Sequence, residues 1–474
     1  MSETIPLINL PEPDAEPVPT VHYVPAYDGK KVYTRRAQGV FQRLRHYVSL
    51  PLLLAFFLLP WLSIDGRPAV YFDMGELKFY VLWGIFWPQD SILLAAILIM
   101  AAFSLLALTV WVGRVWCGFS CPQTLWTLMF IWIEDKCEGD RNQRIKLDKA
   151  PWSRQKLLKK FNKHSLWLLL SIFTAITFVA YFYNIHTLLD DILSLNVSVG
   201  GLVWIALFAL MTYLNAGWLR EQVCKHMCPY SRFQSAMYDD NTLLVAYDEG
   251  RGEGRGPRKP GTNYREQNLG DCIDCNWCVQ VCPADIDIRD GLQAECINCG
   301  LCIDACDSVM EKMGYEKGLI RFSSVSGEPS ALKRFLQPKM LAYCVVLLTM
   351  AATFTYSVTD RIPLQVDVIR DRGAHMFRDR NGYIENVYLV KLNNMMDHAD
   401  TVFLTVRGDQ PYKIRGNKPI YLEAGEIFTV AIRLVLKKEL LTRSNEVVFI
   451  KAQSSASPEV AAEQKTVFMG PMVK

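Results

Sequence analysis

The sequence predicts a multi-domain membrane protein, and three observations support this prediction. Long apolar runs indicate a five-helix α transmembrane domain. Eight of the 14 cysteines repeat one spacing twice, which indicates an inserted bacterial-type 2[4Fe-4S] ferredoxin domain. Short β-branched runs near the C-terminal end indicate an all-β immunoglobulin-like sandwich. A chain of 474 residues has room for about three domains.

Five apolar runs reach or approach the length that a helix needs to cross about 30 Å of hydrocarbon. They are residues 47–64, 91–112, 166–183, 202–218 and 340–356. A hydrophobic content of 51% with 12 Trp fits a chain that lies partly in lipid. Residues 69–87 are also apolar but contain Asp73, Glu76 and Lys78, so we expect an interfacial or re-entrant segment there.

Lys and Arg are distributed unevenly between these spans. Residues 1–46, 113–165 and 219–339 contain 6, 11 and 15 of them, whereas residues 65–90 and 186–200 contain 2 and none. Basic segments next to membrane helices stay in the cytoplasm. We therefore expect the N terminus and the ferredoxin domain on the cytoplasmic side and the C-terminal domain on the opposite side.

These patterns divide the chain into six segments. They are a cytoplasmic N-terminal tail (1–46), a membrane domain with spans one to four (47–248), a flexible linker (249–264), a ferredoxin domain (265–325), a connector with the fifth span (326–358) and an exterior immunoglobulin-like domain (360–474). The tail is rich in proline, which favours disorder. The run 249–257 is rich in glycine, which favours flexibility.

Two consecutive copies of one cysteine pattern supply the ligands of two iron–sulfur clusters. In this pattern, three cysteines of one copy and the fourth of the other copy bind one cube. The expected ligands are Cys272, Cys275, Cys278 and Cys306 for cluster one, and Cys296, Cys299, Cys302 and Cys282 for cluster two. Pro283 follows the first copy, as in bacterial ferredoxins, whereas Asp307 stands where a second proline is expected. Two structural zinc sites are the alternative, but zinc has no use for a crossed pair of patterns.

A second pattern, Cys-x-x-x-Cys-Pro, occurs twice, each time just after a predicted span. One copy holds Cys117 and Cys121, and the other holds Cys224 and Cys228. Cysteines four residues apart share one face of a helix, and the proline suits the first turn of the next segment. If the two halves pack together, four thiolates converge, and soft thiolates favour Cu(I), zinc or an iron–sulfur cluster. His226 is a further candidate ligand, and close helix packing is the structural alternative.

Basic residues flank both of these motifs. We expect Arg114, Arg220 and Lys225 to favour the thiolate form of the cysteines. Cys137 and Cys344 have no partner in the sequence, and Cys344 lies within the predicted fifth span, where it is most simply a packing residue.

The last part of the chain has a different pattern. Four β-branched runs are separated by clusters of Gly, Asn, Asp and Pro, and about seven short strands fit the segment. The runs are residues 384–392, 401–407, 427–435 and 446–452. Met395, Met396 and His398 form a weak candidate copper contact, because so short a motif is more often incidental.

Several functions are disfavoured. The net charge is only +3, and the basic residues follow the predicted topology, so we expect no nucleic-acid partner. The sequence also contains neither a Walker-type phosphate loop nor a GxGxxG dinucleotide fingerprint.

The combined motifs resemble the cytochrome c oxidase accessory proteins CcoG, FixG and RdxA. The resemblance rests on both Cys-x-x-x-Cys-Pro motifs, the double ferredoxin pattern and the segments 116–124, 138–141, 146–148, 313–315 and 318–321. It extends from about Tyr33 to the C-terminal domain and implies a bacterial inner (cytoplasmic) membrane protein whose C-terminal domain is periplasmic. It also implies a role in assembling cbb(3)-type oxidase through reduction of Cu(II) to Cu(I).

The resemblance assigns the reactive and copper-binding role to Cys117, Cys121, Cys224 and Cys228. The resulting hypothesis is an oxidoreductase, a cupric reductase, in which electrons pass from an unknown donor through two [4Fe-4S] clusters to copper. The expected partners are copper ions, the lipid membrane, and oxidase subunits or copper chaperones. Two rivals stay open: a quinol-linked subunit resembling the membrane ferredoxins of periplasmic nitrate reduction, and a non-catalytic assembly scaffold. The long exterior β domain favours the oxidase-assembly family over the nitrate-reduction proteins.

Overall fold

The computed structural model describes residues 31–471, apart from 65, 76, 262–263, 265–267, 325–332, 334, 361–362, 371–376, 381, 397 and 417. Most of the predicted N-terminal tail therefore lies outside the described residues. The chain forms two compact units, Met1–Ala352 and Thr353–Lys474, which we describe separately.

Four helical segments in the described part of the chain are long and apolar enough to cross a membrane, by length and composition. They are Val40–Trp61, Ser91–Val112, Val199–Leu219 and Pro338–Thr359. The first contains helix α1 (Val40–Leu58), the second is α2, the third joins α8 (Val199–Thr212) to the π-helix η3 (Tyr213–Leu219), and the fourth is α14. These correspond to the predicted spans one, two, four and five, and they identify a membrane protein.

The predicted third span lies in α6 (Arg154–Val179), a helix of 26 residues that packs along α4 (Pro122–Glu138) and α8. Its first half is basic and includes Lys156 and Lys163, and the helix ends at Val179 instead of reaching residue 183. The apolar part is therefore short. The structure consequently provides four clear candidate spans where the sequence predicts five.

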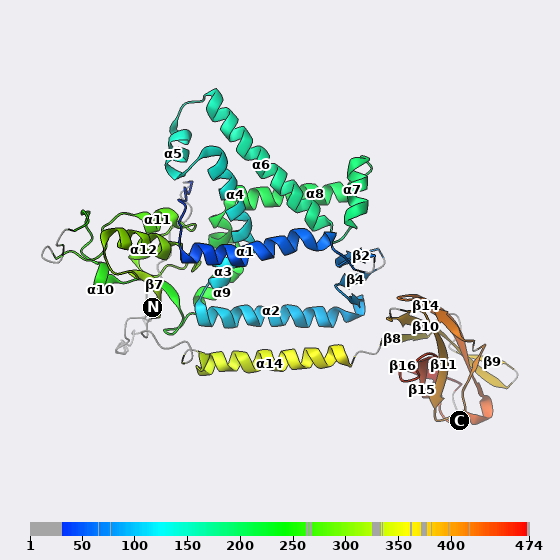
Figure 1. Cartoon of the computed structure of the whole chain (residues 1–474). Helices are drawn as coiled ribbons and strands as arrows, with labels where there is room; N and C mark the ends of the chain where they lie inside the picture. Colours follow the sequence, from blue (N-terminus) through cyan, green and yellow to red (C-terminus); the bar gives the residue numbers. More distant parts are fainter. Residues whose placement is uncertain are drawn as a thin grey trace, which may run out of the picture. The chain divides into compact units, whose positions relative to one another are not determined.

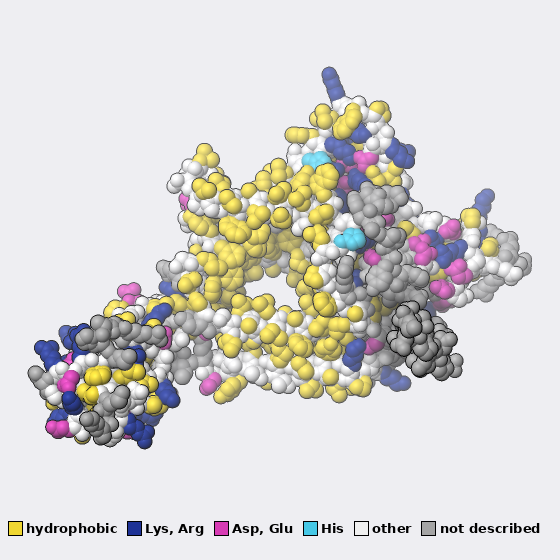
Figure 2. All heavy atoms as spheres, turned by 180° about the vertical axis from the view of Figure 1, so that it is seen from behind, with side chains coloured by type: hydrophobic (Ala, Val, Ile, Leu, Met, Phe, Trp, Pro, Cys, Tyr) yellow, Lys and Arg dark blue, Asp and Glu magenta, His cyan; other side chains and the backbone are white. Residues whose placement is uncertain are grey.

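Large apolar side chains cover the outside of these helices. Leu94 and Leu98 on α2 are 59% and 61% exposed, and Leu348 on α14 is 70% exposed. Figure 2 shows hydrophobic side chains across the helical region and charged side chains gathered at the end where the ferredoxin domain lies. Such a surface is stable in lipid, because burying it in hydrocarbon removes apolar area from water.

Residues 69–87 contain no helix long enough to cross a membrane. They form a three-stranded antiparallel sheet of β3 (Val70–Asp73), β4 (Lys78–Val81) and β5 (Gly84–Phe86), next to the hairpin β1 (Ser63–Ile64) and β2 (Arg67–Pro68). Figure 1 shows these strands and the ferredoxin domain at opposite ends of α1 and α2. An interfacial position of this sheet stays a prediction.

Five short helices of this unit lie between or after the longer ones. They are α3 (Val115–Phe119), α5 (Arg141–Lys149), α7 (Ile185–Leu193), the π-helix η4 (Val223–Met227) and α9 (Pro229–Ala236). The α3 and α4 pair and the η4 and α9 pair follow α2 and η3, so they lie at the ends of two candidate spans.

The ferredoxin domain begins earlier than predicted. Strand β6 (Leu244–Tyr247) pairs antiparallel with β7 (Ile320–Ser323), so the fold starts at Leu244 and not at residue 265. Besides the short α10 (Glu249–Gly252), three helical segments of the described chain lie between these strands, namely α11 (Trp277–Val281), η6 (Ile288–Asp290) and α12 (Leu301–Met313). Their apolar side chains pack with β6 and β7 in one core.

The predicted flexible linker needs correction over residues 249–257. Its first residues form α10 (Glu249–Gly252), and Asp271 N donates to Arg251 O at 2.9 Å. A Cβ at Gly254 would lie 2.8 Å from the backbone oxygen of Asn268. The glycines therefore permit close packing on the ferredoxin domain. Glycine content alone could not separate this use from chain flexibility.

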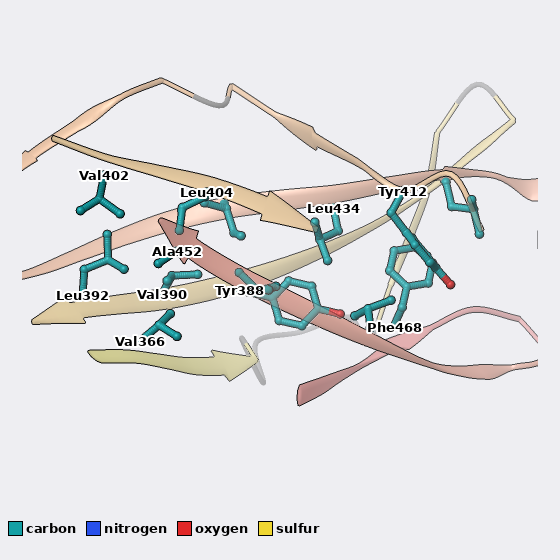
Figure 3. Close-up of a cluster of buried hydrophobic side chains, with 14 of the residues drawn as sticks. Val366, Tyr388, Val390, Leu392, Val402, Leu404, Tyr412, Leu434, Ala452 and Phe468 are labelled. Carbon is teal, nitrogen blue, oxygen red and sulfur yellow. The ribbon is translucent and has the colours of Figure 1, made fainter. Parts of the chain in front are cut away.

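The second unit is an antiparallel β-sandwich, as the sequence predicts. One sheet has the order β12-β14-β10-β8, with β9 also on β10, and the other has the order β13-β11-β15-β16. The strands are β8 (Leu364–Arg370), β9 (Arg378–Arg380), β10 (Tyr383–Asn394), β11 (Asp400–Gly408), β12 (Lys413–Arg415), β13 (Ile420–Leu422), β14 (Ile427–Lys437), β15 (Asn445–Ser454) and β16 (Ala461–Met469). Figure 3 shows side chains from both sheets meeting between them, among them Val390, Leu404 and Phe468.

Candidate iron–sulfur and cysteine centre

Two small cavities in the ferredoxin domain bring the predicted ligands together. One cavity is lined by Cys272, Cys275, Cys278 and Cys306, the four cysteines assigned to cluster one. The other is lined by Cys282, Cys296, Cys299 and Cys302, the four assigned to cluster two, together with Cys278. Each cavity thus combines three cysteines of one copy with the fourth of the other. The assignment of each cysteine to a cluster stays a prediction. The cysteines that line each cavity are the ones that the crossed ferredoxin pattern requires.

Left-handed backbone positions wind the ligand loops around these cavities. Asp274, Asn276 and Asn298 have positive φ angles of 53°, 56° and 50°, and Gly300 has 72°. Short polar residues and glycine tolerate this conformation best. Backbone N–H groups also reach the sulfurs, because the amide of Asn298 donates to Cys296. Such hydrogen bonds tune the reduction potential of an iron–sulfur cluster.

The cysteines fit iron–sulfur clusters better than single metal ions. All 14 are free. Burial raises the pKa of Cys278 to about 12 and that of Cys296 to about 11, so cluster iron has to displace protons from these thiols. Among the described residues, no group of three or more His, Cys, Asp or Glu is placed to hold one metal ion. A cube spreads its sulfurs more widely, because each sulfur binds a different iron.

Asp307 explains the departure from the bacterial ferredoxin pattern. Its carboxylate accepts a hydrogen bond of 2.9 Å from the backbone N–H of Gly318. The side chain thereby ties helix α12 to the loop that leads into β7. The missing proline is replaced by a structural contact, and the neighbouring ligand Cys306 still lines its cavity.

The Cys-x-x-x-Cys-Pro motifs do not have the predicted one-helix geometry. Cys117 lies in α3, but Cys121 is extended, with φ −62° and ψ 129°, and precedes α4. Cys224 lies in η4, and Cys228 is likewise extended, with φ −81° and ψ 111°, before α9. A residue before proline is driven out of the helical region, so the second cysteine ends one helix instead of sharing it. The predicted place of the proline, at the start of the following helix, is correct.

The two motifs nevertheless approach each other. Cys121, Cys224 and Cys228 are all close enough to raise the pKa of Cys117, and Cys117 Sγ donates to Gln234 Oε1 on α9 at 3.3 Å. The four sulfurs therefore share one region of the membrane domain, although they do not form a compact single-ion site.

The thiols of Cys117, Cys121 and Cys224 are protonated without metal, because burial raises the pKa of each. Burial raises the pKa of Cys117 and Cys224 to about 12, and the neighbouring sulfurs add to the effect. Arg114 acts in the opposite direction but is outweighed by burial. Arg114 therefore favours the thiolate form as expected, but burial has the larger effect at Cys117 and Cys224. His226 is exposed and joins no metal-binding group among the described residues.

The cluster-two loop packs directly on the first motif. A Cβ added to Gly118 would lie 2.7 Å from the backbone oxygen of Ile297 and 3.2 Å from Cys299 Cβ. Cys117 packs against the same small apolar cluster, which includes Ile297 and Cys299. Asn298 Nδ2 also donates to Val112 O, at the end of α2, at 3.5 Å. Gly118 thus permits the shortest approach between the two kinds of cysteine site.

The ferredoxin domain also holds the start of α1. Asp304 on α12 accepts hydrogen bonds from the backbone N–H groups of Phe41 and Gln42, at 3.1 and 2.8 Å. These donors have no partner within the helix, and a carboxylate at a helix N terminus is favoured by the helix dipole. A residue 263 positions away in the sequence therefore supplies the N-terminal cap of the first span.

A buried network of charges, which the sequence analysis did not predict, lies beneath the second motif. Glu134 on α4 is fully buried and pairs with Arg144 and Arg220, each at 3.0 Å, and with Lys31 at 3.3 Å. Arg220 immediately follows η3 and so anchors the segment that carries Cys224. The one available signal is a Glu–Asp pair inside an otherwise apolar helix, since buried charges require partners.

The other candidate residues lie apart from these sites. Cys137 packs beside the aromatic cluster of Phe130 and Trp167, and Cys344 is half-buried in α14. Met396 is buried, whereas His398 is exposed. No metal-binding group involves His398 among the described residues, so the structure lends no support to a copper contact there.

Known proteins match this chain over most of its length. Residues 219–325 match the family model of the 4Fe-4S dicluster domain, and residues 354–471 match that of the Ig-like fold at the C terminus of FixG. Nitrogen fixation protein FixG of Rhizobium meliloti (strain 1021) is 36% identical over 422 residues, which cover 81% of this chain and 80% of FixG.

Two further relatives come from Cereibacter sphaeroides. Protein RdxB is 35% identical over 425 residues, which cover 86% of this chain and 89% of RdxB. Protein RdxA is 34% identical over 423 residues, which cover 85% of this chain and 88% of RdxA. The dicluster match accounts for the two cysteine-lined cavities, and the C-terminal match accounts for the β-sandwich.

Proposed function

This chain belongs to the FixG and RdxA family, and on that premise we propose that it is a membrane-bound electron-transfer protein that reduces Cu(II) to Cu(I). The Cu(I) would be used in assembling cbb(3)-type cytochrome c oxidase. The observation that supports this proposal most strongly is the contact of Gly118 and Cys117 with the loop of Cys299. This contact puts the loop of the cluster-two cysteines next to the first Cys-x-x-x-Cys-Pro motif, as electron transfer to copper at that motif would require.

The reaction requires one electron for each copper ion. Bound iron–sulfur clusters supply one-electron chemistry, often at low potential. Cys117, Cys121, Cys224 and Cys228 bind Cu(II) as their thiols release protons, and thiolate ligands favour the Cu(I) product. One electron leaves the ferredoxin domain, Cu(II) becomes Cu(I), and the sulfurs are not oxidised. A cytoplasmic iron–sulfur or flavin protein, or a membrane quinol, replaces the electron.

We also propose five spans, with the N terminus and ferredoxin domain in the cytoplasm and the sandwich domain in the periplasm. The alternating distribution of Lys and Arg supports this orientation. In α6, basic side chains such as Lys156 and Lys163 occupy the first half, so the second half enters the lipid with its basic end at the cytoplasmic surface. The sandwich would then contact an oxidase subunit or a copper chaperone.

The proposal is tested with the full chain, purified without oxygen in detergent. The protein is reduced, freed of reductant and mixed with Cu(II), while a Cu(I)-specific chelator reports the product. We expect about one Cu(I) for each electron stored. Changing all four cysteines of the motifs to serine should abolish fast reduction and copper binding while both clusters remain visible by electron paramagnetic resonance (EPR) spectroscopy.

Cys137→Ser provides the matched control, because Cys137 lies outside both motifs and packs among aromatic side chains. It should retain the reduction rate and copper content of the unmodified protein. If the four-serine variant keeps both clusters and also keeps its rate and copper content, the assignment of copper to these cysteines is wrong. A protein that oxidises quinol but never reduces Cu(II) would instead support the quinol-linked alternative.

A further inference from the structure

Arg45 is a buried cation that forms no ion pair with any described residue. It lies in the second turn of α1, is 1% exposed, and its Nε and Nη1 have no hydrogen-bond partner among the described residues. Nor does Arg45 take part in an ion pair in the described part of the chain. A buried guanidinium is stable only beside a compensating negative charge. The functional protein must therefore place an anion next to it.

The surroundings of Arg45 identify this anion. Arg45 lines one cavity together with Pro283 and Leu301. It lines a second cavity together with Ile297. These three residues each neighbour a predicted ligand of cluster two in the sequence. Arg45 is also close enough to Cys299 for their charges to interact. Leu301 and Ile297 also line the cavity of the cluster-two cysteines, so Arg45 lies next to residues that form the wall of that cavity.

Nearby carboxylates already have other partners. Asp135 lines the same cavity as Arg45 but pairs with Arg36 at 2.7 Å. Asp304 on α12 accepts its hydrogen bonds from the start of α1, including one from Phe41 N. Glu221 and Glu295 also line a cavity with Arg45, but neither forms an ion pair with it among the described residues. An iron–sulfur core with four thiolates carries a net negative charge and supplies the missing counter-charge.

A second buried arginine acts on a predicted ligand of cluster two. Arg114, 3% exposed, lies at the start of α3 and lowers the pKa of both Cys296 and Cys117, whereas Glu295 acts in the opposite direction at Cys296. Both arginines come from the membrane domain, so the ferredoxin domain acquires these cations only by docking on it.

Cluster one has a different electrostatic environment. The cation that acts on Cys278 is Arg289, which is paired with Asp274 at 2.6 Å and with Asp287. Asp307 adds a negative charge beside Cys306. Reduction adds one negative charge to a cluster, so cations favour the reduced form and anions oppose it.

We infer that Arg45 and Arg114 raise the reduction potential of cluster two above that of cluster one, which directs electrons from cluster one to cluster two and then to Cys117. In this step, cluster one loses one electron and cluster two gains it. The inference rests on the two clusters of the proposed function but does not require copper reduction. Arg45 is a positioning residue in this sense, because it acts through the cluster and touches no substrate.

The test is an anaerobic redox titration of the full chain in detergent, followed by EPR spectroscopy. Arg45→Gln should lower the ratio of reduced to oxidised cluster at least tenfold at a fixed potential, about 59 mV for a one-electron couple, for one cluster only. Arg45→Lys, which keeps the charge, should restore most of the ratio. Arg43→Gln is the matched control, because Arg43 lies on the same helix but is exposed.

Arg114→Gln provides an independent variant and should shift the same EPR signal as Arg45→Gln. If Arg45→Gln loses a cluster, the potentials of Arg45→Lys and Arg114→Gln show whether the buried arginines raise the reduction potential of cluster two. Unchanged potentials, or equal shifts of both clusters, overturn the inference. Because the titration contains no copper, a failure of copper reduction alone would leave this result standing.

Discussion

Replacing Glu134 tests whether the buried charge network holds the membrane domain together. Its carboxylate is the common partner of Arg144, Arg220, Lys31 and Lys163, which come from four separate parts of the chain. Glu134→Gln keeps the size of the side chain but leaves these cations without their shared anion. Breaking one side of a buried ion pair is strongly destabilising, by about 3–5 kcal/mol.

The magnitude can also be estimated from the carboxylate itself. Burial alone would raise the pKa of Glu134, but Arg220, Lys31 and the other cations lower it from 4.5 to about 2. At about 1.4 kcal/mol for each pKa unit, this corresponds to about 3 kcal/mol. Because the pKa is lowered in the folded protein, this stabilisation is complete above about pH 4.5 and is lost as the pH falls towards 2.

Thermal unfolding of the full chain in detergent at neutral pH measures the effect. We expect Glu134→Gln to lower the midpoint of the helical unit by roughly 6 °C or more. Glu311→Gln is the control, because Glu311 and its partner Lys317 are 70% and 56% exposed. Exposed pairs of this kind contribute about 0–1 kcal/mol. If the two variants melt at the same temperature, the network does not stabilise the fold as we reason.

Two further predictions concern other parts of the chain. Gly118→Ala should reduce iron content or weaken coupling between the two cysteine sites, because its Cβ would lie 2.7 Å from the backbone of Ile297, whereas Gly200→Ala, with nothing within 4 Å, should leave both unchanged. Equal iron content and copper-reduction rates in both variants would contradict the close approach. Glu446→Gln should destabilise the β-sandwich by about 1–3 kcal/mol in chemical unfolding, because Glu446 is buried and accepts a hydrogen bond from Tyr412. Burial raises the pKa of Glu446, but its hydrogen bonds have the larger effect and lower it. The destabilisation caused by Glu446→Gln should therefore shrink as the pH falls below about 4.5. A destabilisation that does not depend on pH would contradict this account.

Features that depend on local spacing could be predicted from the sequence. The ligands of the iron–sulfur clusters could be predicted because a [4Fe-4S] cluster requires cysteines at fixed short intervals. The strands β10, β11, β14 and β15 could be predicted because β-branched runs bounded by Gly, Asn, Asp and Pro clusters favour strands. The helix containing Cys117 and Cys121 was mispredicted, although the proline after Cys121 carried the signal, since the residue before a proline avoids the helical conformation.

Features that depend on distant partners could not be predicted. Arg45 and Arg114 belong to segments whose basic residues indicate only topology, and nothing local distinguishes a buried arginine from one at the surface. The partner of Glu134 nearest in the sequence is Arg144, whereas Arg220 is 86 residues away. The length of the third span was overestimated, because the apolar run in the sequence continues past Val179, where helix α6 ends.

The cap that Asp304 provides for α1 has a consequence for the order of biogenesis. The start of α1 is synthesised 263 residues before the carboxylate that satisfies its amide groups. Asp304 lies between Cys302 and Cys306, so its position depends on the helix that both clusters organise. The first membrane helix therefore reaches its final hydrogen bonding only after α12, at the far end of the ferredoxin sequence, has been made and has packed against it.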